Sequence, residues 1–433
     1  MRTVFSAGSA LTMAAVALAA AAAQPAPADD PLERARALTR SAPLIDGHND
    51  YAWAVREEAP TLDLAAVDIR GAQPRTMTDI PRLRAGGVGA QFWSVYVPVS
   101  LQGQAATRAV LEQIDLVHRM VTRYPDTFEM ARTADDIDRV VKAGRIASLL
   151  GMEGGHAIDN SLGTLRMMHA LGAAYMTLTH SDNVPWADAS TDTPQLGGLS
   201  RFGEEVVLEM NRLGMLVDLS HVSTDTMADA LRVSRAPVIF SHSSARAICD
   251  HPRNVPDDIL GRLKTNGGVA MVTFVPSFIA PEGGRRYPLQ LATRRRLRKA
   301  HPNDPARVEA RMQAWYKAHP DPLATLAMVA DHIDHMRQVA GIDHVGIGSD
   351  FDGIQSTPIG LEDVSKYPAL TAELLRRGYS EGDVQKVLGQ NVLRVMRDVE
   401  RTAATLQKER PPSTATIEGL DGKKSESSES NKK

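Results

Sequence analysis

A histidine and an aspartate, His48 and Asp50, stand two residues apart at the end of an apolar run that begins at Leu44. On a β-strand, residues i and i+2 point to the same side, so these two side chains would share a face. Imidazole and carboxylate together suit a borderline-soft divalent cation such as zinc. A turn histidine and a helix-capping aspartate would give the same letters, so the pair gains weight only because similar endings recur downstream.

Short apolar runs alternate along the chain with amphipathic stretches, a pattern typical of β/α units around a parallel sheet. Eight such runs predict a (β/α)8 TIM-type barrel, whose active site lies at the C-terminal ends of its strands. Helices are expected between the runs, as at residues 162–171, 202–213 and 323–339. Residues 281–322 are expected to form a helical insertion near the barrel mouth. The predicted strands are residues 43–50, 88–97, 146–154, 173–180, 216–221, 237–243, 268–274 and 344–352.

Six of the eight runs end in a histidine or an acidic residue, which an ordinary exit from a sheet does not require. One catalytic zinc needs only three protein ligands, so this set is large enough for two metals. A carboxylate such as Glu153 can bridge two ions. His48 and Asp50 would then complete one site, and His221 and His242 the other. The residues at these ends are His48, Asp50, Glu153, His180, His221, His242 and Asp350.

Catalysis by a serine or cysteine nucleophile is not favoured. The pairs Ser220-His221 and Ser241-His242 place serine beside histidine, but neighbouring residues of a strand face opposite ways, so no catalytic dyad is expected. The sequence has no G-x-S-x-G, H-E-x-x-H or Walker motif. Its single cysteine, Cys249, excludes an intramolecular disulfide and is expected to be a small buried side chain.

The N-terminus carries one charge, Arg2, before an apolar stretch and an alanine-rich end, which predicts a signal peptide over residues 1–23, cleaved near Ala23. The chain would then be exported, to a periplasm or to the medium. No other apolar stretch approaches the roughly 20 residues of a membrane-spanning helix, so the mature chain is expected to have no transmembrane segment. Residues 24–407 are expected to form one domain, and residues 408–433 a disordered polar tail.

Charge argues against nucleic acid as a partner. Loss of Arg2 changes the formal net charge from −3 to −4, which is mild for this length and leaves no basic face. The basic run at residues 294–299 is a local exception, and it is expected to be one solvated face of a helix in the insertion. Small molecules are therefore the expected partners.

The motifs resemble those of the membrane (renal) dipeptidase family of binuclear zinc metallopeptidases, within the amidohydrolase-like barrels. The resemblance runs from about Ala42 to Val399 and rests on LIDGHND, GMEGGH, LTHSDN, LVDLSHVS, PVIFSHSSARAI, HPRNVPDD and HVGIGSDFDG, in the family's order. It implies a zinc-dependent dipeptidase with two Zn²⁺ per chain, bridged by Glu153 and a water or hydroxide. It also implies a homodimer. The metal positions that it assigns are His48, Asp50, Glu153, His221 and His242.

The same resemblance gives three further residues roles at the substrate. His180 is similar to the substrate-orienting histidine, Arg253 to the carboxylate-binding arginine and Asp350 to the proton-transferring aspartate. Elementary chemistry agrees, because a guanidinium binds a carboxylate in bidentate fashion and an aspartate outside the ligand set is free to move a proton. An imidazole near the metals would steady an oxyanion. The single Cys249 and the polar tail depart from the disulfide and the glycolipid anchor of the animal members.

The expected function is hydrolysis of dipeptides with a free C-terminal carboxylate, and two alternatives stay open. Another binuclear-metal hydrolase of this barrel type, such as a lactonase, phosphoesterase or deaminase, would not need Arg253 as a carboxylate clamp. A metal-dependent binding protein without catalysis would not need Asp350 beside five ligands.

Overall fold

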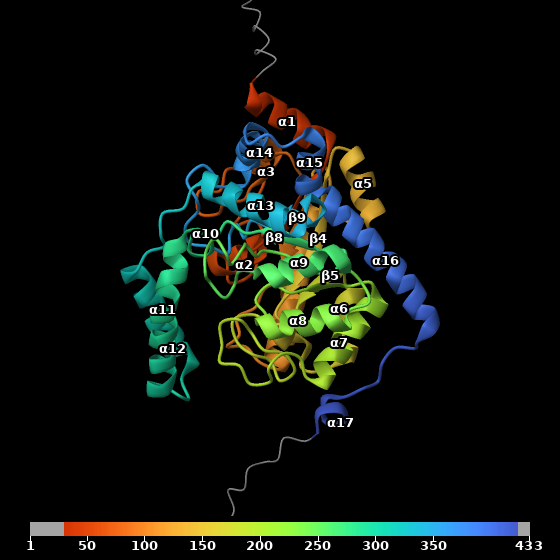
Figure 1. Cartoon of the computed structure of the whole chain (residues 1–433), viewed down its shortest axis with the longest axis vertical. Coiled ribbons are helices and arrows are strands. Elements are labelled where there is room, and N and C mark those ends of the chain that lie inside the picture. The colour runs from red at the N-terminus through yellow and green to blue at the C-terminus, as the bar shows by residue number, and fades with distance from the viewer. Residues whose placement is uncertain (1–29, 423–433) are drawn as a thin grey trace, which may run out of the picture.

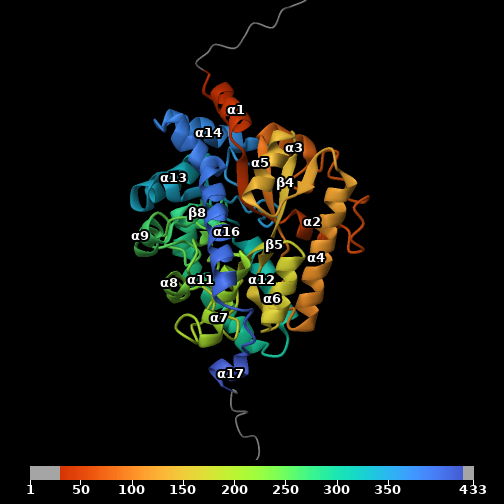
Figure 2. The ribbon, with the colours of Figure 1, turned by 90° about the vertical axis from the view of Figure 1, so that its right-hand side faces the viewer.

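The computed structural model describes residues 30–422, so the predicted signal peptide lies outside the described residues. Eight parallel strands form a closed barrel, in the order β2-β1-β9-β8-β7-β6-β5-β4, and the pairing of β2 with β4 closes the ring. Helices surround it (Figures 1 and 2). The predicted (β/α)8 barrel is confirmed. The strands are β1 (Leu44–Asn49), β2 (Val88–Ser94), β4 (Ile146–Glu153), β5 (Ala173–Thr177), β6 (Leu216–Asp218), β7 (Ile239–Phe240), β8 (Val269–Val272) and β9 (Val345–Ile347).

One further strand, β3 (Phe128–Met130), was not predicted from the sequence. It pairs in parallel with the first half of β4, over residues 146–148, and β5 pairs with the second half from Leu150 onwards. β3 therefore extends the sheet beside β4 without joining the ring. Its three residues, Phe128-Glu129-Met130, lack the longer apolar run that predicted each strand of the ring.

The helices begin and end with ordinary capping signals. Ser161, Ser200 and Thr325 each accept a backbone hydrogen bond at the start of a helix, and Gly214 ends the helix that Ser200 begins, in the left-handed conformation with φ of 82°. The three helices expected between strands are confirmed. The helices are α1 (Pro31–Ser41), α2 (Tyr51–Glu58), α3 (Ile80–Gly86), α4 (Gln104–Arg123), α5 (Ala134–Lys142), α6 (Leu162–Ala170), α7 (Arg201–Leu213), α8 (Thr224–Val233), α9 (Asp257–Asn266), α10 (Pro276–Ile279), α11 (Pro281–Ala300), α12 (Pro305–Ala318), α13 (Leu326–Ala340), α14 (Tyr367–Arg376), α15 (Glu381–Gln385), α16 (Asn391–Glu409) and α17 (Ile417–Asp421).

The predicted insertion is helical: α11 and α12 pack against each other at one side of the molecule (Figure 1). Arg298 of α11 forms ion pairs with Asp182, at 2.5 Å, and Asp192, at 3.1 Å, in the loop that follows β5. Arg294 donates a hydrogen bond to Tyr316 of α12. The basic run is therefore not simply a solvated face, because two of its arginines attach α11 to the loop after β5 and to α12.

The C-terminal segment is more ordered than its polar composition predicted. α16 extends to Glu409, and α17 contacts the start of α7, where Asp421 accepts hydrogen bonds from Ser200 Oγ (2.6 Å) and the Phe202 amide (3.2 Å). The prediction of a disordered tail is thus wrong for residues 408–422. Its remainder, residues 423–433, lies outside the described residues.

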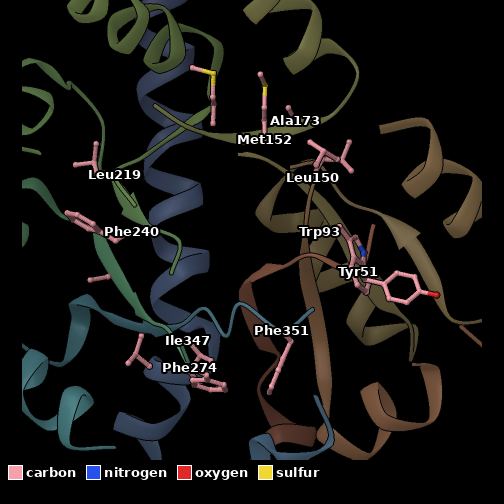
Figure 3. Close-up of a cluster of buried hydrophobic side chains, with 14 of the residues drawn as sticks. Tyr51, Trp93, Leu150, Met152, Ala173, Leu219, Phe240, Phe274, Ile347 and Phe351 are labelled. Atoms are coloured by element: carbon pink, nitrogen blue, oxygen red, sulfur yellow. The ribbon is translucent and has the colours of Figure 1, made fainter. Parts of the chain in front are cut away.

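Two apolar clusters lie on opposite faces of the strands. In β4, Ala147 and Leu149 belong to one cluster, and Leu150 and Met152 belong to the other, which is drawn in Figure 3. Alternation with period two places Glu153, at the end of β4, in the row of Ala147 and Leu149. Cys249 is buried, as expected. No helix within residues 30–422 is both long enough and apolar enough to cross a bilayer.

Close backbone contact at Gly348, just after β9, gives a test of the packing. A Cβ atom there would lie 1.7 Å from the backbone oxygen of Ser241, which cannot rotate away. Gly348→Ala should therefore lower the free energy of unfolding by roughly 1–3 kcal/mol, as overpacked cores do. Gly261→Ala in α9 is the matched control, because a Cβ there meets nothing within 4 Å and alanine favours helix. Equal stability of the two variants in urea denaturation would contradict this packing.

Candidate active site and metal centre

Glu153, the last residue of β4, lies at the centre of the residues predicted from the sequence. Its Oε2 is 3.5 Å from His48 Nε2, and its Oε1 is 2.9 Å from His221 Nε2 and 3.4 Å from His242 Nε2. The two oxygens of one carboxylate therefore face different imidazoles. A carboxylate that bridges two cations needs this arrangement.

The other predicted residues complete the cluster from the neighbouring strand ends. Asp50 Oδ2 lies 3.1 Å from His48 Nε2. The side chains form three groups, and within each group the potential ligand atoms all lie within 4.8 Å of one another. His48 and Glu153 each belong to two of the groups. The structure thus brings residues from six strand ends to one place. The groups are His48 with Glu153 and His242, Glu153 with His180 and His221, and His48 with Asp50 and Asp350.

Burial differs within the cluster. The side chains of His48, Glu153 and His242 are 0%, 5% and 1% exposed, whereas that of His180 is 18% exposed. Asp350 is also only partly buried. His180 and Asp350 therefore face the solvent side of the cluster, where a substrate would enter.

The buried polar atoms fit divalent metal ions. His48 Nε2, Asp50 Oδ1 and His221 Nδ1 have no hydrogen-bond partner among residues 30–422, although buried polar atoms are normally paired. The Nε2 atoms of His221 and His242 lie only 2.9 Å apart. Burial lowers the pKa of both imidazoles well below the usual value, so each has a lone pair to offer. Three imidazoles and two carboxylates are a donor set that suits zinc.

Crowding of carboxylates gives a second sign of cation binding. Burial raises the pKa of Asp350 well above its usual range, and the nearby carboxylates of Asp50 and Glu153 add to the shift. Burial also raises the pKa of Glu153. Several acids held together out of water repel one another, and a bound cation would relieve that repulsion.

The backbone at the site adopts unusual conformations. His221 and Asp350 have φ of +69° and +71°, and they are two of the six non-glycine residues in the described part of the chain with positive φ. Such conformations persist only where the surroundings hold them. Gly353 lets the loop after β9 close on the site, because a Cβ there would lie 2.2 Å from Asp50 Oδ2 and 2.6 Å from Asp350 Oδ1.

Arg253 lies on the loop after β7 and is 2% exposed. Its Nη1 donates to Ser243 Oγ at 3.2 Å and its Nη2 to the His242 carbonyl at 3.3 Å, while Nε has no partner. No carboxylate within residues 30–422 forms an ion pair with it. Burial lowers its pKa to about 10, which leaves the guanidinium charged at neutral pH. Asp350, Glu153 and Asp218 lie near enough to stabilise its charge, but its Nε has no partner within the described residues, so the group can still bind an anion.

One argument from the sequence is wrong. β7 ends at Phe240, so the alternation of a strand does not apply to the next two residues. Ser241 Oγ in fact lies 2.8 Å from His242 Nδ1. It also donates to Asp218 Oδ2 at 2.6 Å, and both residues are fully buried, so the serine supports the histidine and is not placed as a nucleophile.

Sequence reasoning also missed residues that support the predicted ligands. Tyr175 Oη lies 2.8 Å from His48 Nδ1, and Ser94 Oγ donates to Glu153 Oε2 at 3.3 Å. Both side chains are polar and stand inside apolar strands. These residues could have been found from the sequence, because each is a polar residue at an inward position of an apolar strand.

Comparisons with known proteins agree with this geometry. A family model described as Membrane dipeptidase (Peptidase family M19) matches residues 32–410. The chain is 42% identical over 395 residues to Dipeptidase verJ of Clonostachys rogersoniana, covering 88% of this chain and 90% of that protein. The crystal structure of the probable dipeptidase PvdM from Pseudomonas aeruginosa superposes with a TM-score of 0.74 at 26% identity, covering 86% of this chain and 99% of that one. The dipeptidase AC, a metallo peptidase, gives a TM-score of 0.69 at 25% identity, with 83% and 98% covered.

The family model matches most of the chain, a relative with 42% identity is a dipeptidase, and the strand ends carry a buried cluster of potential metal ligands. The chain therefore belongs to the membrane dipeptidase family and is a metal-dependent dipeptidase.

Proposed function

We propose that this chain hydrolyses dipeptides with a free C-terminal carboxylate. The observation that carries the proposal is the buried guanidinium of Arg253, which pairs with no carboxylate in residues 30–422 and contacts the carbonyl of His242. A guanidinium binds a carboxylate through two parallel hydrogen bonds. Since a dipeptide has its only peptide bond one residue from its carboxylate, this clamp would place that bond beside the cluster. Lactonase, phosphoesterase and deaminase substrates do not require it.

The proposed cofactors are two zinc ions per chain, with Glu153 as the shared ligand. Support comes from the two Glu153 oxygens, which face His48 on one side and His221 and His242 on the other. Bound zinc supplies Lewis acidity and lowers the pKa of a water molecule. The proposed ligands are His48, Asp50, Glu153, His221 and His242.

Asp350 and His180 are the proposed groups on the substrate side. Asp350, partly exposed beside His48 and Asp50, would accept a proton from the attacking water and deliver it to the leaving amine. His180, 3.8 Å from Glu153 at its Nε2, would orient the scissile carbonyl and stabilise its developing negative charge. Both roles require contact with substrate, which agrees with their exposure.

Export to a periplasm or to the medium is the proposed localisation. It is supported by the single positive charge, the apolar stretch and the alanine-rich end of residues 1–23. N-terminal sequencing of the mature protein tests it, and a first residue close to Gln24 is the expected result.

Arg253→Ala tests the substrate class. A charge-assisted contact contributes about 1.5–3 kcal/mol, so kcat/KM for a dipeptide should fall by roughly 10- to 150-fold. The corresponding dipeptide amide should be a poor substrate of the wild type and should hardly respond to the substitution. Metal content serves as the control, because Arg253 also contacts the His242 carbonyl. If the wild type cleaves acid and amide equally well, Arg253 does not recognise the C-terminus.

Glu153→Gln tests the shared ligand. The wild type is expected to hold about two zinc ions per chain, since five ligands exceed the need of one site. A neutral amide bridges two cations poorly, so the variant should lose both ions, while His221→Ala should lose mainly one. Elemental analysis after gel filtration gives the metal content. Wild-type metal content in Glu153→Gln would remove Glu153 from the bridge.

Asp350→Asn separates proton transfer from metal binding. The substitution keeps the shape of the side chain but removes its basicity, so kcat should fall by roughly 10²- to 10⁴-fold. Both zinc ions should stay bound. Loss of zinc in this variant would make Asp350 a ligand, and wild-type kcat would exclude it as the acid–base group.

A further inference from the structure

Of the three histidines proposed as zinc ligands, two have a hydroxyl group next to Nδ1, and the third, His221, does not. His242 Nδ1 lies 2.8 Å from Ser241 Oγ, and His48 Nδ1 lies 2.8 Å from Tyr175 Oη. His221 Nδ1 has no hydrogen-bond partner among residues 30–422. A hydroxyl can donate or accept a hydrogen bond. The other hydrogen-bond partner of the hydroxyl therefore decides which nitrogen of the histidine carries the proton.

Asp218, the last residue of β6, lies behind Ser241. Its Oδ2 accepts from Ser241 Oγ at 2.6 Å and from Thr177 Oγ1. Its Oδ1 accepts from the backbone amides of Ser241, at 2.8 Å, and Ser220, at 3.1 Å. Thr177, Asp218 and Ser241 are all fully buried. Four donors thus surround a carboxylate that can only accept.

The direction of the hydrogen bonds follows from this count. A hydroxyl has one proton, and Ser241 Oγ lies 2.6 Å from the Asp218 carboxylate but 3.4 Å from Ser220 Oγ, so the proton goes to Asp218 and Ser241 Oγ accepts from His242. His242 therefore carries its proton on Nδ1, and the lone pair of Nε2 faces Glu153 Oε1, 3.4 Å away.

We propose that Asp218, acting through Ser241, is a positioning residue that fixes His242 in the tautomer that binds zinc. The inference rests on the proposed function in one respect, that His242 is a zinc ligand. Outer groups of this kind typically change metal affinity by about 10- to 100-fold when they are removed.

Asp218→Asn gives the sharpest test because the backbone dictates how the amide must sit. The two amides at Oδ1 are fixed donors, so the carbonyl oxygen of asparagine stays there and its NH₂ group takes the place of Oδ2. The NH₂ then donates to Ser241 Oγ, and the serine proton turns to His242 Nδ1. The imidazole proton moves to Nε2, where it blocks the metal.

Two further variants distinguish an effect on the His242 tautomer from a general effect of disturbing the buried contacts of Asp218. Ser241→Ala removes the hydrogen bond to His242 Nδ1, so the imidazole can adopt either tautomer. Its loss of zinc affinity should therefore be smaller than that of Asp218→Asn. Thr177→Val is the matched control, because it removes another hydroxyl from the same carboxylate oxygen without touching the path to His242. It should bind zinc as the wild type does.

The experiment has two readouts that do not depend on dipeptidase activity. Zinc release from the loaded full-length chain into excess chelator gives the affinity, and it does not require the metal-free protein to be folded. Nitrogen-15 spectra of histidine-labelled protein after zinc removal distinguish protonated from unprotonated ring nitrogens, with His242→Gln used for assignment. Asp218→Asn should release the weaker-held zinc at a free concentration about 10- to 100-fold higher, and its His242 proton should lie on Nε2.

Either of two results would overturn the proposal. His242 protonated on Nδ1 in Asp218→Asn would show that the aspartate does not set the tautomer. Equal loss of zinc in Thr177→Val and Asp218→Asn would show that the carboxylate serves only the packing of β5, β6 and β7. Failure of the proposed function looks different: the wild type would bind zinc and still not cleave dipeptides, with the tautomer result unchanged.

Discussion

The burial of several ionisable groups around Glu153 is the constraint on which the site depends. A carboxylate that is 5% exposed and lies 2.9 to 3.5 Å from three imidazole nitrogens is tolerable only with compensating positive charge. Two of the three imidazoles do not supply it, because burial lowers the pKa of His221 and His242 well below the usual value, and only His48, whose pKa is raised by neighbouring groups such as Glu153 and Asp50, can carry a proton charge there. Divalent cations would supply the rest, which makes this barrel mouth a place where metal binding and stability are linked.

Two buried aspartates hold the strand ends that carry the proposed ligands. Asp46 of β1 accepts from the amide and the hydroxyl of Ser349 after β9, at 2.7 and 2.8 Å, and from Tyr367 of α14 at 2.8 Å. Asp218 makes the corresponding contacts among β5, β6 and β7. Each lies two or three residues before a predicted ligand, His48 or His221. The hydrogen bonds that join neighbouring strands therefore also set the spacing of the proposed metal-binding side chains.

The sequence predicted the strands and the cluster because both follow from local patterns. The apolar runs of the ring extend beyond their short strands, as at residues 216–221 around β6, whereas β3 (Phe128–Met130) contains Glu129 and is soon followed by Arg132. Residues beyond a strand end were harder: Ser241 follows a two-residue strand, and His221 has a positive φ, so alternation no longer gives the direction of their side chains. The order of α17 depends on contacts with Ser200 and Phe202, more than 200 residues away, which composition cannot show.

The three histidines of the proposed centre are not equally prepared for a metal. His48 faces Tyr175, whose hydroxyl donates to the Gly47 carbonyl, an obligate acceptor, at 3.1 Å, so Nδ1 of His48 also carries a proton. His221 has a left-handed backbone and no partner at Nδ1 within the described residues. Two of the proposed ligands are thus oriented by the fold itself. The third, His221, would be oriented by a bound metal, because its Nδ1 has no hydrogen-bond partner within the described residues.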